Sequence, residues 1–319
     1  MTELSTLHFA HPAYQLEAAY AARDLAGATF QTWTPDETAA RIAEAEVFVA
    51  SGLWRNEFLD QAPKLEYVHV CAAGYDSYDL DAFRAHGVRL SNSSGVNVNA
   101  VSDHGMALIL SLSRQLHLAR DRQARAEWRG MIADIGAREE ELAGKTLVIY
   151  GLGGIGGRLA RLAGAFGMRV IGIKRNTSVA VDGVDNLHKP DAFMDLLGEA
   201  DIVALTCPLT DETRGLIDAA ALGRMKPGAY LINLARGPVV NETDLVEALK
   251  NGRIAGAGLD VFDPEPLPAA SKLWGFDNVV ITPHSGGETR AYEENVIDLL
   301  AENLQRLRSG ETELINQIV

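Results

Sequence analysis

The sequence predicts an α/β protein with two domains, each built on a parallel sheet. Its 319 residues exceed what one hydrophobic core usually accommodates. Short apolar runs alternate with stretches of helical spacing along most of the chain, a pattern typical of doubly wound parallel sheets. Apolar residues make up 47% of the chain and charged residues 23%, a balance that argues against wholesale disorder.

The first sheet is predicted from about Leu4 to Leu90, where each apolar run leads into a polar loop. Alternation and turn residues predict strands over 47–50, 67–70 and 88–90 and helices over 35–44 and 80–86. This succession favours a small parallel unit of flavodoxin-like type. Ser102 and Asp103 predict the start of the next helix, whose largely apolar part spans 106–118. We expect that helix to be buried between domains or at a subunit interface, and 120–141 to form a surface connection.

A second series of strands begins at 146–150. It continues at 170–173, 202–205, 229–232, 257–259 and 279–281, with a helix at 158–166 and a last helix at 290–309. Strands alternating with helices again indicate a doubly wound parallel sheet. We expect a substrate domain of residues 1–98 plus 290–319, a dinucleotide-binding domain of residues 99–289, and a cleft between the two.

Bulk composition excludes several classes of function. A net charge of −14 disfavours nucleic acid and anionic membrane as partners. Cys71 and Cys207, the two cysteines, predict no disulfide framework and favour the reducing cytoplasm. Neither lies at a metal-ligand spacing, so no metal site is expected. Residues 1–4 show no start of a secretory signal, and no apolar run approaches the ~20 residues of a membrane helix.

A glycine-rich loop, Gly151-Leu152-Gly153-Gly154-Ile155-Gly156, follows the strand at 146–150 and opens a helix. Alone, such a motif is weak evidence, but this context is the one that binds a dinucleotide. The first glycine permits the tight turn, the second lets pyrophosphate approach the backbone, and the third allows the helix to pack on the strand. The helix N-terminus then faces the phosphates.

The end of the next strand bears on which dinucleotide is bound. An NAD site places a carboxylate roughly 20 residues after the loop, where it binds the ribose 2′-hydroxyl. This chain places Lys174, Arg175 and Asn176 there. Two cations can pair with a 2′-phosphate, so we predict NADP(H) in preference to NAD(H). The alternative is an exposed basic turn without a role in selectivity.

Three charged side chains follow strands of the second series. Arg236 comes after the strand at 229–232, and His284 after the strand at 279–281. Ligands bind at the carboxyl ends of such strands. Arg236 can hold a carboxylate, and His284 can exchange a proton near neutral pH. Glu265, between two prolines, can orient the imidazole. The set predicts reduction of a carbonyl beside a carboxylate.

Four segments resemble the signatures of the D-isomer-specific 2-hydroxyacid dehydrogenases, in particular NADP-type glyoxylate/hydroxypyruvate reductases. They are 151–156, 232–237, 259–266 and 282–284, and the resemblance is strongest over 142–287. It implies a Rossmann cofactor domain. It also implies Arg236 as the substrate anchor and His284, paired with Glu265, as the general acid/base.

The resemblance implies further contacts. Gly154 and Ile155 would present backbone to the pyrophosphate, and Asp260 would contact the nicotinamide amide. The remaining residues expected on the cofactor side are Cys207, Pro208, Thr213, Leu234, Ala235 and Gly286. In the first domain, Ala73 and Gly74 lie in a loop whose N–H groups would bind the substrate carboxylate. Lys174-Arg175 stands where NAD-using members have an acidic residue. Asp103-His104 stands where many members have Glu-His, and we assign no function to this replacement.

We therefore predict a cytoplasmic, homodimeric enzyme that reversibly reduces a small 2-oxo acid to the D-2-hydroxy acid. Trp54 is expected to reach the substrate, with plain packing as the alternative. Two other functions stay open: a dinucleotide-sensing, corepressor-like interaction protein, and an NAD-linked enzyme similar to phosphoglycerate dehydrogenase. Formate dehydrogenase is disfavoured because its histidine usually pairs with an amide. His69, inside an apolar strand, is predicted to be a hydrogen-bonded core residue.

Overall fold

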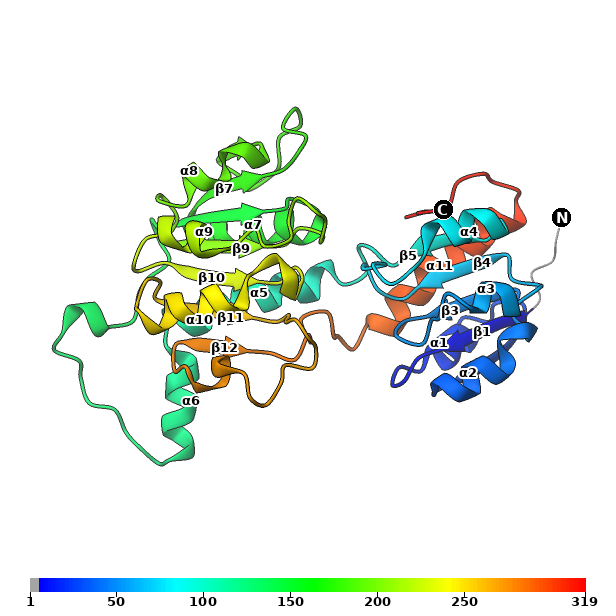
Figure 1. Cartoon of the computed structure of the whole chain (residues 1–319), viewed down its shortest axis with the longest axis horizontal. Helices are drawn as coiled ribbons and strands as arrows, with labels where there is room; N and C mark the ends of the chain where they lie inside the picture. Colours follow the sequence, from blue (N-terminus) through cyan, green and yellow to red (C-terminus); the bar gives the residue numbers. More distant parts are fainter. Residues whose placement is uncertain (1–5) are drawn as a thin grey trace. The chain divides into compact units, whose positions relative to one another are not determined.

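The computed structural model describes residues 6–319, so the prediction made for residues 1–4 lies outside the described chain. Two compact units are present. One comprises residues 6–97 and Thr289–Val319, and the other comprises Val98–Glu288. Each is built on its own parallel sheet with helices on both faces, which confirms the predicted fold class (Figure 1).

The first unit contains a five-stranded sheet in the order β2-β1-β3-β4-β5, with every neighbouring pair parallel. This is the flavodoxin-like order. Its strands are β1 (Thr6–Ala10), β2 (Ala28–Thr32), β3 (Val47–Ala50), β4 (Tyr67–Val70) and β5 (Arg89–Asn92). Strands β1 and β2 lacked a specific prediction. β2 reads Ala-Thr-Phe-Gln-Thr and is only partly buried at the sheet edge, so it carries little apolar signal.

Helices cover both faces of this sheet. They are α1 (Leu16–Ala21), α2 (Pro35–Arg41), α3 (Phe58–Gln61), α4 (Leu80–His86) and α11 (Tyr292–Arg308). Local sequence explains their ends: Thr34 and Asp79 cap α2 and α4 with side-chain oxygens, and Gly87 ends α4 in the left-handed conformation. Alternate residues of the central strands face two separate apolar clusters, as Val47 and Phe48 do.

The second unit contains a seven-stranded parallel sheet in the order β12-β11-β10-β9-β6-β7-β8. Figure 1 shows this succession from β12 upward to β7. Its strands are β6 (Thr146–Tyr150), β7 (Arg169–Ile173), β8 (Asn186–His188), β9 (Ile202–Leu205), β10 (Tyr230–Asn233), β11 (Gly256–Leu259) and β12 (Val279–Ile281). The order reverses between β6 and β9, and such a reversal opens the crevice where dinucleotides bind.

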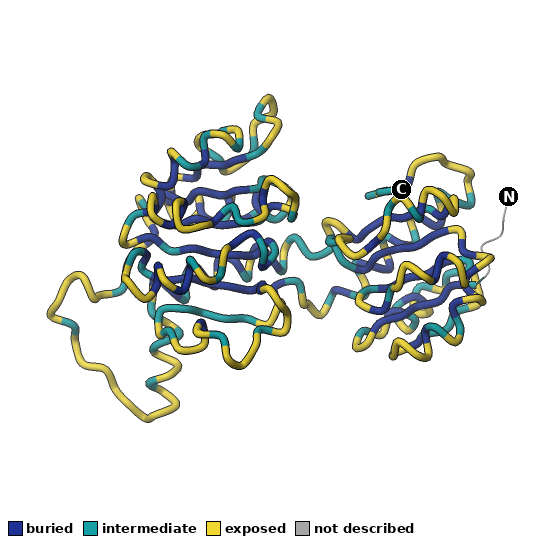
Figure 2. The backbone as a smooth tube through the Cα atoms, in the orientation of Figure 1, coloured by how far each residue is buried: buried dark blue, intermediate teal, exposed yellow. Residues whose placement is uncertain are grey.

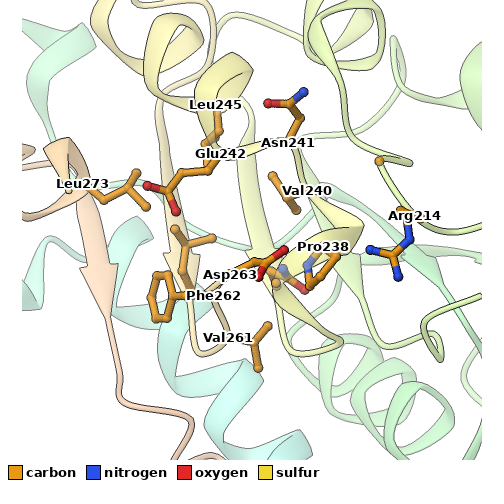
Figure 3. A pocket seen from close by; sticks show the side chains of 14 residues that line it. Arg214, Pro238, Val240, Asn241, Glu242, Leu245, Val261, Phe262, Asp263 and Leu273 are labelled. Carbon is orange, nitrogen blue, oxygen red and sulfur yellow. The ribbon is translucent and has the colours of Figure 1, made fainter. Parts of the chain in front are cut away.

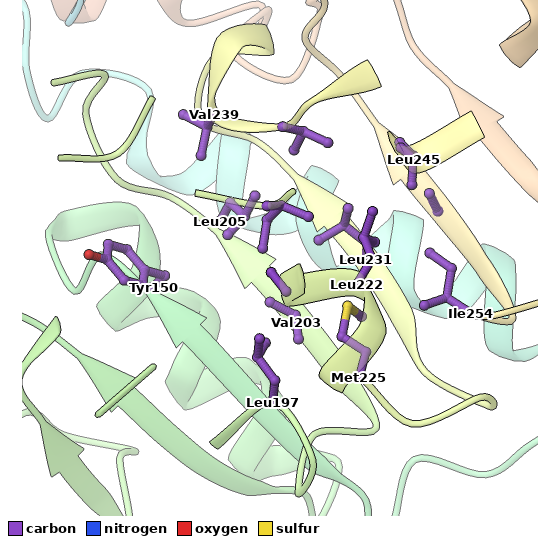
Figure 4. Close-up of a cluster of buried hydrophobic side chains, with 14 of the residues drawn as sticks. Tyr150, Leu197, Val203, Leu205, Leu222, Met225, Leu231, Val239, Leu245 and Ile254 are labelled. Atoms are coloured by element: carbon purple, nitrogen blue, oxygen red, sulfur yellow. The ribbon is translucent and has the colours of Figure 1, made fainter. Parts of the chain in front are cut away.

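Six helices belong to this unit among the described residues. They are α5 (Val98–Ser113), α6 (Leu116–Ala124), α7 (Gly154–Ala165), α8 (Phe193–Leu196), α9 (Ala219–Arg224) and α10 (Glu242–Lys250). Residues such as Val203, Leu205 and Leu231 form the cluster on one face of the sheet (Figure 4). In Figure 2 the central strands of this sheet are buried, the edge strand β12 is intermediate, and many of the connecting loops are exposed. No helix among residues 6–319 is long and apolar enough to cross a membrane.

Two predictions around α5 need correction. The helix expected to continue to Leu118 breaks at Gln115, whose φ is 51°, and the start of the expected connection is helical in α6. The apolar residues of α5, such as Ile109 and Leu112, pack with Leu147 and Ile232 of the unit's own sheet. That contact buries the apolar side of α5 within its own unit.

Candidate active site

The three charged residues predicted to act in catalysis follow three adjacent strands. Strands β10, β11 and β12 are neighbours in the sheet, and all of them are parallel. Arg236 follows β10, Glu265 lies in the loop after β11, and His284 follows β12. Because parallel strands end at the same edge of a sheet, the fold brings the three loops together.

Arg236 is held by its own loop. The buried Asn233 side chain accepts a hydrogen bond from the Ala235 N–H (3.1 Å) and donates one to the Arg236 carbonyl (3.1 Å). The next residue, Gly237, touches the loop after β11 so closely that a Cβ there would overlap the carbonyl of Phe262. A side chain at position 237 would therefore push Arg236 away from the Glu265 loop.

Glu265 and His284 form a hydrogen-bonded pair. Glu265 Oε2 lies 2.8 Å from His284 Nδ1, while Oε1 accepts the Phe262 N–H at 2.9 Å. Because a carboxylate only accepts, Nδ1 carries a hydrogen and Nε2 remains for the substrate. The His284 side chain is 47% exposed. The paired and accessible imidazole matches what a general acid requires.

The turn that carries His284 has an unusual backbone. His284 has φ of +53°, a left-handed conformation that non-glycine residues seldom adopt. Asp260, at the end of β11, accepts hydrogen bonds from the N–H groups of Ser285 (3.0 Å) and Gly286 (3.0 Å). Asp260 is buried. These bonds hold the chain directly after His284.

The glycine loop fits the pyrophosphate of a dinucleotide. Helix α7 begins at Gly154 without a side-chain cap, because Gly153 occupies the N-cap position. The N–H groups of the first turn, including those of Ile155 and Gly156, therefore lack that partner. A Cβ built on Gly153 would meet no atom within 4 Å, so phosphate oxygens can approach the backbone there.

Other residues expected at the cofactor lie on nearby loops. Thr206 Oγ1, directly after β9, donates to the carbonyl of Gly151 (2.6 Å) and joins the two loops at the reversal of strand order. Burial raises the pKa of the adjacent Cys207 to about 11, which keeps its thiol protonated. Thr213 donates to the Pro208 carbonyl at 2.7 Å. Leu234 and Ala235 are buried beside Arg236.

The basic turn lies at the expected place after β7. Arg175 and Asn176 are exposed, and Lys174 is half-buried. Asn176 accepts hydrogen bonds from the N–H and the hydroxyl of Ser178 (3.0 and 2.6 Å), which rigidifies the turn. Neither Lys174 nor Arg175 is in an ion pair with any residue of the described chain.

The expected substrate residues Trp54, Ala73 and Gly74 belong to the first unit, at the ends of β3 and β4. Trp54 stacks on Tyr78 with ring centroids 5.5 Å apart, and it also contacts Phe48. It thus packs with core residues of this unit. Ala73 is half-buried, and its carbonyl accepts a hydrogen bond from Asn92 (2.6 Å).

A pocket of about 290 Å³ adjoins the catalytic loops (Figure 3). Gly237 and Phe262, which belong to the loops of Arg236 and Glu265, line it. The side chains of Arg236, Glu265 and His284 do not. It is therefore distinct from the candidate catalytic surface.

Sequence reasoning missed several residues that position this site. Asn233 ends β10, and Thr206 directly follows β9. Their position at the carboxyl end of a strand could have identified both from sequence. His104 lies far away in sequence, yet its Nε2 is 2.9 Å from the hydroxyl of Thr282. No local pattern reveals that contact.

Comparison with known proteins agrees with this geometry. The family model for the NAD binding domain of D-isomer specific 2-hydroxyacid dehydrogenases matches residues 106–286. Glyoxylate/hydroxypyruvate reductase B of Serratia proteamaculans is 39% identical over 288 residues, covering 88% of this chain and 87% of that protein. Glyoxylate reductase of Thermococcus litoralis is 37% identical, covering 85% and 82%.

A solved structure indicates the same family. A D-isomer specific 2-hydroxyacid dehydrogenase family protein from Aeromonas salmonicida superposes with a TM-score of 0.86 at 30% identity, covering 99% of each chain. The matched residues include the glycine loop, Arg236, Glu265 and His284. The chain therefore belongs to the D-isomer specific 2-hydroxyacid dehydrogenase family and is an oxidoreductase.

Proposed function

We propose that this enzyme uses NADP(H) to reduce a small 2-oxo acid, reversibly, to the D-2-hydroxy acid. The observation that carries the proposal is the Glu265–His284 pair, whose Oε2 and Nδ1 atoms are 2.8 Å apart, on the loops that follow β11 and β12. Relatives named glyoxylate and hydroxypyruvate reductases support glyoxylate and hydroxypyruvate as substrates.

The proposed mechanism uses each of the three residues differently. When bound, the reduced nicotinamide supplies a hydride to C2 of the substrate. Arg236 pairs with the substrate carboxylate and holds the carbonyl in place. His284 donates the proton on Nε2 to the carbonyl oxygen as negative charge develops there. Glu265 keeps the ring oriented through Nδ1 and stabilises its protonated form. In the reverse direction neutral His284 accepts the alcohol proton.

The two directions therefore depend on opposite protonation states of His284. Reduction requires the protonated ring, and oxidation requires the neutral ring. We expect the rate of reduction to fall and the rate of oxidation to rise as pH increases. Initial rates in both directions across a pH series would check this. Parallel pH profiles would contradict the role of His284.

The cofactor would be held by residues of the second unit. Gly153, Gly154 and Ile155 present the backbone to pyrophosphate, and Asp260 is the proposed contact for the nicotinamide amide. The basic turn carries the proposed selectivity for NADPH, because Lys174 and Arg175 have no ion-pair partner among the described residues and can pair with a 2′-phosphate. Ala73 and Gly74 are proposed to bind the substrate carboxylate through backbone N–H groups.

A direct test compares NADPH and NADH oxidation by the purified protein with a panel of 2-oxo acids. We expect turnover with NADPH and one preferred acid. In the Lys174→Ala/Arg175→Ala variant, the KM for NADPH should rise by about 10-fold to 100-fold while that for NADH changes little. Arg169→Ala, at the start of β7 and paired with Glu199 at 3.1 Å, is the matched control. Preference for NADH in the wild type would refute the selectivity, and cofactor binding without any turnover would favour a sensing protein.

We also propose a homodimer in the cytoplasm. Two buried free thiols suit a reducing compartment. The segment after α6 projects from the second unit as an extended arm (Figure 1) and exposes Trp128 (97%), Met131 (103%) and Ile135 (78%). Such a set of large apolar side chains indicates a protein contact, and a second copy is the partner proposed. Light scattering of the wild type and of Trp128→Glu/Met131→Glu tests it: a wild-type monomer would refute the dimer.

A further inference from the structure

A partly buried polar cluster beside the His284 turn joins three elements. Asp260 directly follows β11, Thr282 follows β12, and His104 lies in the second turn of α5. The Thr282 hydroxyl is 2.6 Å from Asp260 Oδ1 and 2.9 Å from His104 Nε2. The side chains of His104 and Asp260 are 22% and 5% exposed.

Hydrogen-bond accounting assigns a direction to this chain. Asp260 Oδ1 accepts from the Ser285 N–H and from the Thr282 hydroxyl, so the single hydroxyl hydrogen of Thr282 is used. His104 Nε2 must then carry the hydrogen and donate it to Thr282. His104 thus donates to Thr282, and Thr282 donates to Asp260.

The cluster holds both ends of the turn that carries His284. Thr282 lies two residues before His284. Ser285 and Gly286, whose N–H groups donate to Asp260, come directly after His284. The packing is tight: a Cβ on Gly286 would lie 2.8 Å from Asp260 Oδ2 and 3.2 Å from His104 Cδ2. A turn held at φ of +53° needs such external support, because that conformation is unfavourable for histidine by itself.

We propose that His104 is a positioning residue for the general acid. Its Nε2–H fixes the Thr282 hydroxyl on Asp260, and this cluster keeps His284 in the turn that presents Nε2 to the substrate. Glu265 sets the rotation of the ring, whereas His104 sets the path of the backbone that carries it. This inference rests on the proposed function, since it assigns His104 to the same reaction.

The neighbouring residue shows that adjacent positions of α5 contact two different elements, a helix and a loop. Asp103 pairs with Arg158 of α7, the helix that opens at the glycine loop. His104 instead faces the loop after β12. Consecutive residues of α5 thus support the cofactor helix and the catalytic turn separately, so a change at His104 can be tested without touching the Arg158 contact.

The experiment compares matched substitutions in the full-length enzyme. His104→Leu and Thr282→Val remove the polar group, while His104→Gln and Thr282→Ser can keep a donor or a hydroxyl in its place. We expect His104→Leu to lower kcat about 10-fold and Thr282→Val about 100-fold, with the KM for the 2-oxo acid within about threefold of wild type. His104→Gln and Thr282→Ser should recover most of kcat. His117→Leu, elsewhere in this unit, is the control and should leave kcat unchanged.

A second readout does not depend on turnover. In the protein without cofactor, amide hydrogen exchange of peptides covering Ser285 and Gly286 should be faster in His104→Leu and Thr282→Val, and unchanged in His117→Leu. Unchanged exchange, or a His104→Leu enzyme with wild-type kcat, would overturn the inference. Should the wild type reduce no 2-oxo acid, the proposed function fails on its own, while exchange still shows whether His104 holds the turn.

Discussion

Two histidines, one in each unit, show how position in a sheet decides what an imidazole can do. His69 lies inside β4 and is fully buried, and hydroxyl groups contact both ring nitrogens: Tyr67 and Ser91 at Nδ1 (2.8 and 3.0 Å) and Ser93 at Nε2 (3.0 Å). His284 lies past the end of β12, is 47% exposed, and bonds a carboxylate through Nδ1 alone. The first ring has no nitrogen left for a ligand, and the second has one.

The charge available to the two rings differs as well. Burial lowers the pKa of His69 to about 3, because no carboxylate compensates for the loss of water. Asn303 of α11 donates to the Tyr67 hydroxyl (3.1 Å) and to the carbonyl of Ile315, so the same network joins β4 to the C-terminal segment. His69 is therefore a hydrogen-bonded core residue, as predicted, and its contribution is to stability.

The His284→Ala substitution should separate the two histidines most clearly. Loss of the general acid should lower kcat for reduction by about 10² to 10⁴-fold, while the unfolding free energy changes by less than about 0.5 kcal/mol because the side chain is exposed. Absorbance of reduced nicotinamide and urea denaturation give the two numbers. A kcat within tenfold of wild type would remove His284 from the chemistry.

His69→Leu should produce the reverse pattern. The change removes the buried partner of Ser93 and two other hydroxyls, which should lower the unfolding free energy of the first unit by about 2–4 kcal/mol. Hydrogen exchange of peptides from β4 and β5 during urea denaturation reports this unit alone. His86→Leu, an exposed histidine of the same unit, is the control and should change little. Lost catalysis in a fully folded His69→Leu enzyme would show that this ring acts in the site after all.

The smallest effect concerns pH. The folded first unit keeps His69 neutral down to about pH 3, whereas the unfolded chain binds a proton near 6.5, so stability is complete above pH 6.5 and falls as pH decreases. Burial also lowers the pKa values of His8 and His11 to about 4, which adds to the fall. Between pH 6.5 and 5.5 each such histidine should contribute a loss of about 1 kcal/mol.

The same exchange measurement at both pH values checks this contribution. His69→Leu should lose about 1 kcal/mol less than wild type over that interval, since one of the three groups is gone. Equal losses in the two proteins would show that His69 is protonated in the folded state.

Much of the second unit could be predicted from sequence because its signals are local. The strands at 146–150, 202–205 and 279–281 are continuous apolar runs, and each ends in turn residues that place a motif at the sheet edge. The break of α5 at Gln115 could not be predicted, since the apolar spacing continues past it. From sequence alone, Trp54 can be interpreted equally well as a substrate contact or as a packing residue, and its ring contacts with Phe48 and Tyr78 come only from the fold.

Local sequence was enough to predict the fold class, the glycine loop and the three charged residues after β10, β11 and β12, because strand ends and turn chemistry depend on residues close in the chain. The way in which those residues are held follows from tertiary packing. Gly237 lies close to the backbone of Phe262, and His104 contacts Thr282, which is 178 positions away. No short stretch of sequence contains both members of either pair. Packing chooses such partners by shape and hydrogen-bond geometry, and both exist only once the sheet and α5 have assembled.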